Sequence, residues 1–170
     1  MDEFTALVII DMQKYFYHRG LEGRYITPEQ MKESWIETVK HINEQIRQAK
    51  KRNIPILVVE FDSNSMDNEN WKTDGRICRT IGSYPYVKYV KKDYDDGSER
   101  IERTLENTDW VVKNFRICGA NRVACVAATV KGLAKRYKDA KIHLVKKAIT
   151  DEGGERGRRG ADRLPNVVMV

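Results

Sequence analysis

The segment Ala6-Leu7-Val8-Ile9-Ile10-Asp11 decides the fold that we predict for this chain. A continuous apolar run of this length is typical of a strand that is buried on both faces of a parallel sheet. Asp11 ends the run at the carboxyl end of the strand. Open parallel sheets bind their ligands beyond these ends, so Asp11 lies where a functional residue is expected.

The rest of the chain alternates between strand-like and helix-like segments. Short apolar runs predict further strands over residues 54–59, 86–90, 115–118, 142–145 and 166–170. Apolar residues at three- and four-residue steps predict helices over residues 27–49, 98–105 and 122–137. This alternation predicts an α/β fold, a parallel sheet with helices on both faces, and one domain over residues 1–170.

The first predicted helix has the clearest start signal. Thr27 is placed as its N-cap, Pro28 at the first helical position, and Gln30 where a capping box needs it. Residues 13–26 and 61–85 are polar and irregular, so we predict loops there. The glycine- and arginine-rich segment 151–160 is also expected to form a loop, a flexible one.

Composition limits the classes of function. The chain has 170 residues, 41% of them hydrophobic, and a formal net charge of +6. Residues 131–170 hold 11 Lys and Arg against 5 Asp and Glu, so the excess positive charge lies there. No aromatic residues interleave the arginine-rich loop and no nucleic-acid motif is present, so we expect a solvated basic surface and no nucleic-acid binding.

The expected cellular location follows from the apolar stretches, the N-terminal residues and the cysteines. No apolar stretch approaches the roughly 18 residues that a membrane span needs, so we expect no membrane association. The start, Met1-Asp2-Glu3-Phe4, lacks the basic and apolar regions of a secretory signal. The three cysteines have neither metal-finger nor disulfide spacing, which favours a reduced, cytoplasmic setting.

Three chemically complementary residues lie at predicted strand ends or just beyond. Asp11 follows the first strand, Lys91 follows the third, and Cys125 lies in the first turn of the helix after the fourth. A helix N-terminus and a nearby lysine both stabilise a thiolate, so we expect a lowered thiol pKa at Cys125. A carboxylate can take the thiol proton and return it to a leaving amine. Taken singly, each residue is more typical of a structural role, as a core cysteine, a capping aspartate or a solvated lysine.

The sequence around these residues resembles that of a known family. Residues 6–13, Ala-Leu-Val-Ile-Ile-Asp-Met-Gln, resemble the opening of the isochorismatase-like cysteine hydrolases, which include nicotinamidases and N-carbamoylsarcosine amidohydrolases. Residues 119–129 are similar to the family's nucleophile segment, in which a cysteine follows a glycine by six positions. Residues 91–95 are similar to its lysine segment. The resemblance covers roughly residues 5–150.

The resemblance implies a fold and a mechanism. The fold is a six-stranded parallel sheet with strand order 3-2-1-4-5-6. Asp11 would be the general base and acid, Lys91 its electrostatic support, and Cys125 the nucleophile that forms a covalent intermediate. A non-proline cis peptide is implied at Ala120–Asn121, with the main-chain N–H groups of Asn121 and Cys125 as the oxyanion hole. Lys92 takes the place of Lys91 if the strand register differs by one residue.

Departures from the family pattern shape the expected substrate site. Residues 60–67 contain no histidine where nicotinamidases carry a metal motif, so we expect no metal and no other cofactor. Aromatic residues of the two long loops would cover the strand ends. The residues expected to contact a small-molecule substrate are Gln13, Phe16, Trp71 and Tyr94. Family members are commonly oligomeric, so a homo-oligomer is expected.

We therefore predict a metal-independent cysteine hydrolase that cleaves an amide-type C–N bond. Two alternatives remain open. One is a catalytically silent scaffold that binds a protein or nucleic-acid partner through the basic segment 131–170. The other is a vinyl-ether hydrolase of the isochorismate type, in which activity depends on the acid more than on the thiol.

Overall fold

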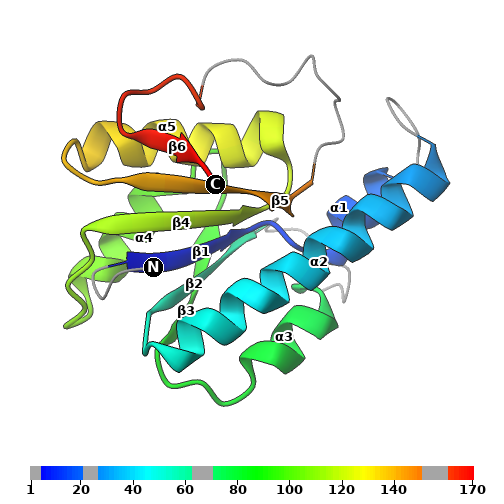
Figure 1. The fold of residues 1–170 in the computed structure, drawn as a ribbon, viewed down its shortest axis with the longest axis horizontal. Coiled ribbons are helices and arrows are strands. Elements are labelled where there is room, and N and C mark those ends of the chain that lie inside the picture. The colour runs from blue at the N-terminus through cyan, green and yellow to red at the C-terminus, as the bar shows by residue number, and fades with distance from the viewer. Residues whose placement is uncertain (1–4, 21–26, 63–70, 151–160) are drawn as a thin grey trace.

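The structure is a computed structural model that describes residues 5–20, 27–62, 71–150 and 161–170. Figure 1 shows one sheet enclosed between two layers of helices. The sheet has six strands in the order β3-β2-β1-β4-β5-β6, and every strand pair in it is parallel. The predicted fold class and strand order are therefore confirmed.

The strands correspond to the apolar runs of the sequence. Their bounds are β1 Thr5–Ile10, β2 Ile56–Phe61, β3 Val87–Lys92, β4 Asn114–Gly119, β5 Ile142–Ile149 and β6 Val167–Met169. Every residue of β1 is buried, as expected for the central strand of a sheet covered on both faces. In contrast, β3 is an edge strand in which several side chains are exposed.

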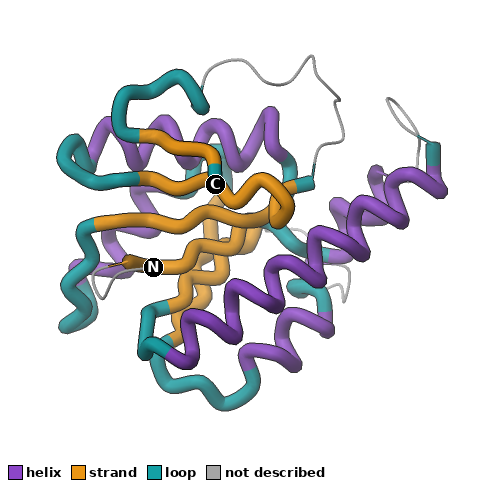
Figure 2. Tube along the Cα trace, viewed as in Figure 1, coloured by secondary structure: helices purple, strands orange, loops and turns teal. Residues whose placement is uncertain are grey.

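Helices cover both faces of the sheet (Figure 2). Their bounds are α1 Lys14–Gly20, α2 Pro28–Lys51, α3 Gly75–Ile81, α4 Ser98–Glu106 and α5 Ala127–Arg136, with a π-helix, η2, over Arg122–Val126. The capping box predicted for α2 is present, because Thr27 Oγ1 accepts a hydrogen bond from Gln30 N and Gln30 Oε1 accepts one from Thr27 N.

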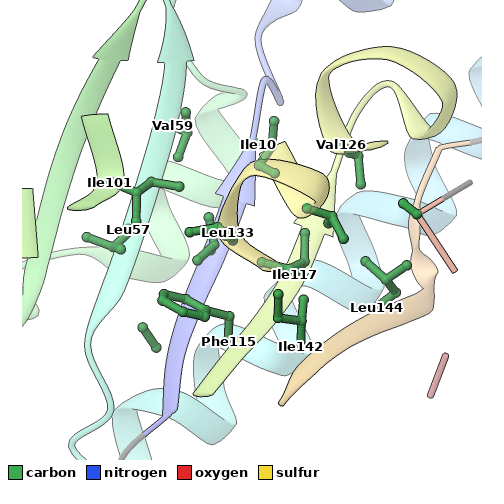
Figure 3. Close-up of a cluster of buried hydrophobic side chains, with 14 of the residues drawn as sticks. Ile10, Leu57, Val59, Ile101, Phe115, Ile117, Val126, Leu133, Ile142 and Leu144 are labelled. Carbon is green, nitrogen blue, oxygen red and sulfur yellow. The ribbon is translucent and has the colours of Figure 1, made fainter. Parts of the chain in front are cut away.

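Alternate residues of each strand supply two separate cores. Ala6, Val8 and Ile10 of β1 belong to a core that faces α4 and α5, and Figure 3 shows side chains of this cluster. Leu7 and Ile9 belong to a second core that faces α2 and α3. Because α2 alone contributes six buried apolar residues to this second core, it is the main element of that layer.

Two helices replace parts of the predicted loops. Helix α1 lies within residues 13–26, and α3 lies within residues 61–85. Asp74 caps α3 by accepting a hydrogen bond from Arg76 N, and Ile77 and Ile81 are buried one turn apart. Both helices have only 7 residues, too few for a periodic pattern to stand out. The loop predicted over 151–160 lies outside the described residues.

The described helices include none that is both long and apolar enough to cross a bilayer.

Candidate active site

Asp11 lies at the carboxyl end of the central strand and is completely buried. Its backbone has φ 49°, in the left-handed region that non-glycine residues adopt rarely and that aspartate tolerates better than most. Asp11 N donates a hydrogen bond to Val59 O, which holds the residue against the end of β2. Unusual backbone conformations of this kind gather at functional sites.

Lys92, and not Lys91, is the lysine beside Asp11. Lys92 Nζ lies 2.8 Å from Asp11 Oδ2, and both side chains are shielded from solvent. Lys91 Nζ instead lies 2.9 Å from Glu60 Oε2, and its side chain is 53% exposed. The prediction of Lys91 as the site lysine is therefore wrong by one residue. Because side chains alternate along a strand, only one of two adjacent lysines faces the core.

A glycine makes room for the buried lysine. A Cβ on Gly97 would lie 3.0 Å from Lys92 Cδ and 3.2 Å from Val59 Cγ1, so a larger residue would compress the lysine. Lys92 Nζ also donates a hydrogen bond of 3.0 Å to Tyr94 O and lies 5.0 Å from the centre of the Phe61 ring. These contacts fix the ammonium group and leave its charge directed at Asp11.

Cys125 lies in the π-helix between β4 and α5. Its side chain is almost fully buried and neighbours the charges of Asp11 and Lys92. Single π-turns within helices occur frequently at functional sites. Asn121 is the N-cap of this turn, accepting a hydrogen bond from Val123 N through Oδ1, as predicted for a cap. The peptide bond between Ala120 and Asn121 is cis, also as predicted.

Gly119 brings the end of β4 against the end of β1. Its φ is +132°, and a Cβ at this position would lie 2.1 Å from Ile10 O. No side chain fits in that space. Ala120 N donates to Ile10 O at 2.8 Å, so the close approach directly links the strand that carries Asp11 to the turn that carries Cys125.

The thiol pKa differs from the sequence-based expectation. Burial and the neighbouring Asp11 carboxylate raise the pKa of Cys125 above its ordinary value, and Lys92 opposes this rise only in part. Burial also raises the pKa of Asp11, although Lys92 and the Cys125 thiol counteract that effect. Both directions oppose ionisation, so burial and the neighbouring carboxylate favour the thiol form of Cys125 over the thiolate that the sequence led us to expect.

A second carboxylate, which the sequence did not reveal, touches the thiol. Cys125 Sγ donates a hydrogen bond of 3.4 Å to Asp95 Oδ1. Asp95 belongs to the turn between β3 and α4, and it is exposed. A polar turn residue gives no periodic or motif signal, so only the spatial arrangement identifies it.

The predicted substrate-contact residues divide into two groups. Phe16 and Trp71 pack edge to face with ring centres 6.2 Å apart, and Phe61 joins them. Gln13 is buried beside them. Its amide accepts a hydrogen bond from Phe61 N and donates to the carbonyls of Phe61 and Trp71, so its hydrogen-bonding groups are engaged by the main chain. The geometry favours a positioning role for Gln13 over the predicted substrate contact.

Tyr94 stands apart from this aromatic group. Tyr94 is 79% exposed, and its main-chain carbonyl accepts the hydrogen bond from Lys92 Nζ. Its contribution to the site in the structure is thus through the main chain. Substrate contact by Tyr94, Phe16 or Trp71, and an oxyanion hole at Asn121 and Cys125, stay predictions.

The side chains that could bind a metal ion are dispersed in the described part of the chain. Within the described part of the chain, no three His, Cys, Asp or Glu side chains form a group suited to a metal ion. Asp62 follows β2, whereas Asp67 lies outside the described residues.

Comparison with known proteins identifies the family. The model of the isochorismatase domain matches residues 5–166. The chain belongs to the isochorismatase family. This assignment agrees with the resemblance of its Asp11 and Cys125 segments, and relatives in this family support an enzyme of the hydrolase type. No curated protein matches the sequence at a significant level.

Solved structures share the isochorismatase fold at low sequence identity. A nicotinamidase from Staphylococcus aureus has a TM-score of 0.77 at 16% identity, with 99% of each chain covered. The N-carbamoylsarcosine amidase from Thermoplasma acidophilum has a TM-score of 0.70 at 17% identity, covering 97% of this chain and 94% of that one. The MAR1 ribonuclease from Caenorhabditis elegans has a TM-score of 0.74 at 16% identity, covering 100% and 79%. These likenesses establish the fold alone.

Proposed function

We propose that this isochorismatase-family protein is a cysteine hydrolase that cleaves an amide-type C–N bond of a small molecule. One observation carries the proposal: a buried carboxylate, a buried ammonium group and a thiol come together from β1, β3 and η2 at one edge of the sheet. Base, charge support and nucleophile are the groups that covalent acyl transfer requires.

The first half-reaction uses the protonated thiol. Asp11 takes the proton from Cys125 as the sulfur attacks the carbonyl carbon, so that a free thiolate does not have to build up. The C–N bond then breaks, and Asp11 returns the proton to the departing amine. The product of this stage is a thioester on Cys125. A raised pKa suits Asp11 to this work, because a base transfers protons best when its pKa approaches that of its partner.

The second half-reaction releases the acid. Asp11 takes a proton from water as the water oxygen attacks the thioester carbon, and the C–S bond breaks. The proton returns to the sulfur, which restores the resting thiol. Lys92 stabilises the carboxylate form of Asp11 in an otherwise apolar environment.

The test is trapping of the covalent intermediate. The protein is incubated with a panel of small amides and ureido compounds, amine release is measured, and rapidly quenched samples are examined by mass spectrometry. We expect an acyl adduct on the peptide that contains Cys125. Cys125→Ser should lose both the adduct and turnover, with little change in stability because the two side chains have similar volumes.

Cys78→Ser is the matched control, since Cys78 is a free thiol outside the site. It should retain adduct formation and turnover. Amine release that survives Cys125→Ala would contradict the proposal, and turnover of a vinyl ether that survives the same substitution would indicate the vinyl-ether type of hydrolysis. Absence of turnover and of any adduct across the panel would favour the silent scaffold.

A further inference from the structure

The carboxylate of Asp95 lies at the mouth of the site and has no part in the mechanism above. Its Oδ1 is 3.4 Å from Cys125 Sγ. Among the residues that the structure describes, no lysine or arginine forms an ion pair with it. Two neighbouring acids differ in this respect, because Asp93 pairs with Arg100 and Glu60 pairs with Lys91.

The position of Asp95 is held by hydrogen bonds on both sides. Thr129 Oγ1 donates to Asp95 O at 3.3 Å and accepts from Gly97 N at 3.0 Å, which ties the turn to the start of α5. Lys92 holds the preceding residue through Tyr94 O. Asp95 is therefore an exposed carboxylate on a fixed main chain, close to the nucleophile.

Charges in the site do not balance. Asp11 pairs with Lys92, whereas Asp95 has no cationic partner among the described residues, so the formal charges of these carboxylates and the lysine leave one negative charge in excess. The Cys125 sulfur thus lies beside two carboxylates, those of Asp11 and Asp95, and the ammonium group of Lys92 is paired with Asp11.

We propose that the substrate carries a cationic nitrogen group within one or two bonds of the attacked carbon, and that Asp95 binds this group. The proposal rests on the function proposed above. An attacked carbon lies about 3–3.5 Å from the nucleophile in a reactive complex, so a nitrogen on or next to that carbon can reach Asp95. A substrate carboxylate at the same position would be repelled.

Two kinds of substrate share this chemistry. An amidinium or guanidinium group presents N–H donors on the attacked carbon itself, and planar groups of this kind pair well with carboxylates. Its hydrolysis consumes water and gives an amide or urea and an ammonium ion. An α-amino amide presents the ammonium one bond further away, and its hydrolysis gives an amino acid and an ammonium ion. In both, sulfur forms the bond to carbon as the C–N bond breaks.

The decisive test measures charge selectivity at the sulfur without using turnover. Cys125 is treated separately with two methanethiosulfonates of similar size, aminoethyl (cationic) and sulfonatoethyl (anionic), and its labelling rate is followed by mass spectrometry. Asp95→Asn should lower the cation-to-anion rate ratio by about three- to tenfold, a range set by the solvent exposure of Asp95. The ratio cancels any change in thiol ionisation, because that change affects both reagents equally.

Two controls accompany this measurement. Asp93→Asn removes an exposed carboxylate from the same turn and should leave the ratio at Cys125 unchanged. Cys78 in the same samples should show an unchanged ratio in every variant. An equal ratio in the wild type and Asp95→Asn would overturn the proposal, as would a sulfur that reacts with neither reagent. These outcomes are separate from the acyl-adduct test, so each proposal can fail independently.

Turnover then distinguishes the two kinds of substrate. Matched neutral amides, α-amino amides and amidines are compared by kcat/KM in the wild type and in Asp95→Asn. For the substrate class that Asp95 recognises, Asp95→Asn should lower kcat/KM about tenfold more than it does for the neutral analogue. This is the size expected for a charge-assisted hydrogen bond. If both cationic classes are turned over no better than the neutral amides by the wild type, the proposal is wrong.

Discussion

At the scale of single residues, the site depends on which of two adjacent lysines points inward. Val90 and Lys92 of β3 are buried, whereas Lys91 between them is exposed. Residues two apart on a strand share a face, so the apolar Val90 was the signal in the sequence that Lys92 also faces the core. The predicted strand ended at Val90, which left the direction of the next two residues open.

Replacing the two lysines separately tests this assignment. Lys92→Met leaves Asp11 buried without its cation and should destabilise the protein by about 3–5 kcal/mol near neutral pH. It should also reduce kcat by roughly 100-fold or more, as expected when general acid–base catalysis is impaired. Lys91→Met removes the exposed ion-pair partner of Glu60 and should lower the free energy of unfolding by about 1 kcal/mol or less. Denaturant unfolding and amine release measure the two effects. Equal losses in both variants would contradict the assignment.

The ionisation of Asp11 predicts a pH dependence. In the proposed mechanism Asp11 must be deprotonated to act as a base, and burial raises its pKa above the ordinary value of 3.8. The acid limb of kcat/KM should therefore lie above pH 3.8, with activity lost as the pH falls through the pKa in the folded protein. In any activity that Lys92→Met retains, the acid limb should lie at a still higher pH, because the variant lacks the cation that favours the charged form of Asp11. A wild-type limb at or below 3.8 would contradict this role.

At the scale of elements, the contact between the ends of β1 and β4 brings Asp11 and Cys125 together. Asp11 and Cys125 were both identifiable from sequence because each is next to a strong element signal, an apolar run or a helix start. The π-helical form of the Cys125 turn was not identifiable, since its spacing differs from an α-helix by one residue per turn. Asp95 was missed because contacts with Thr129 and Lys92 define the conformation of its turn. Thr129 is distant in the sequence, and the contact with Lys92 follows no sequence pattern.

Gly119 gives a prediction for this contact. Gly119→Ala places a methyl group against the Ile10 carbonyl and should destabilise the protein by about 3 kcal/mol or more, since both the conformation and the space oppose a side chain. Gly75→Ala is the control, because a Cβ there lies at an ordinary distance of 3.4 Å from a flexible arginine. Its effect on the free energy of unfolding should be no more than about 1 kcal/mol. Similar values for the two variants would contradict this interpretation.

At the scale of the whole molecule, the layered architecture was predictable because it follows from the alternation of buried strands and amphipathic helices. Short helices such as α1 and α3 were not, because they are held by contacts between distant segments. Trp35 of α2, for example, donates an indole hydrogen bond of 3.0 Å to Asp74, the N-cap of α3. The expected homo-oligomer stays a prediction that light scattering can check.

Trp35 tests how strongly that outer layer is held together. It is 1% exposed, and Trp35→Ala should destabilise the protein by about 3–5 kcal/mol through the cavity that it leaves. Trp35→Phe retains most of the side-chain volume and should lose less stability than Trp35→Ala. Its remaining loss should be due to the missing hydrogen bond with Asp74. The melting temperature and denaturant unfolding measure both. A near-neutral Trp35→Ala variant would show that this layer adds little to stability.

The burial of Cys125, together with the raised pKa of its thiol, has a consequence for chemical durability. Peroxides oxidise the ionised form of a cysteine far faster than the neutral form, and the first product, a sulfenic acid, leads on to irreversible species. A sulfur that keeps its hydrogen and is shielded from solvent resists this damage between catalytic cycles. The neighbouring acids that delay ionisation would thus also preserve the enzyme during oxidative stress.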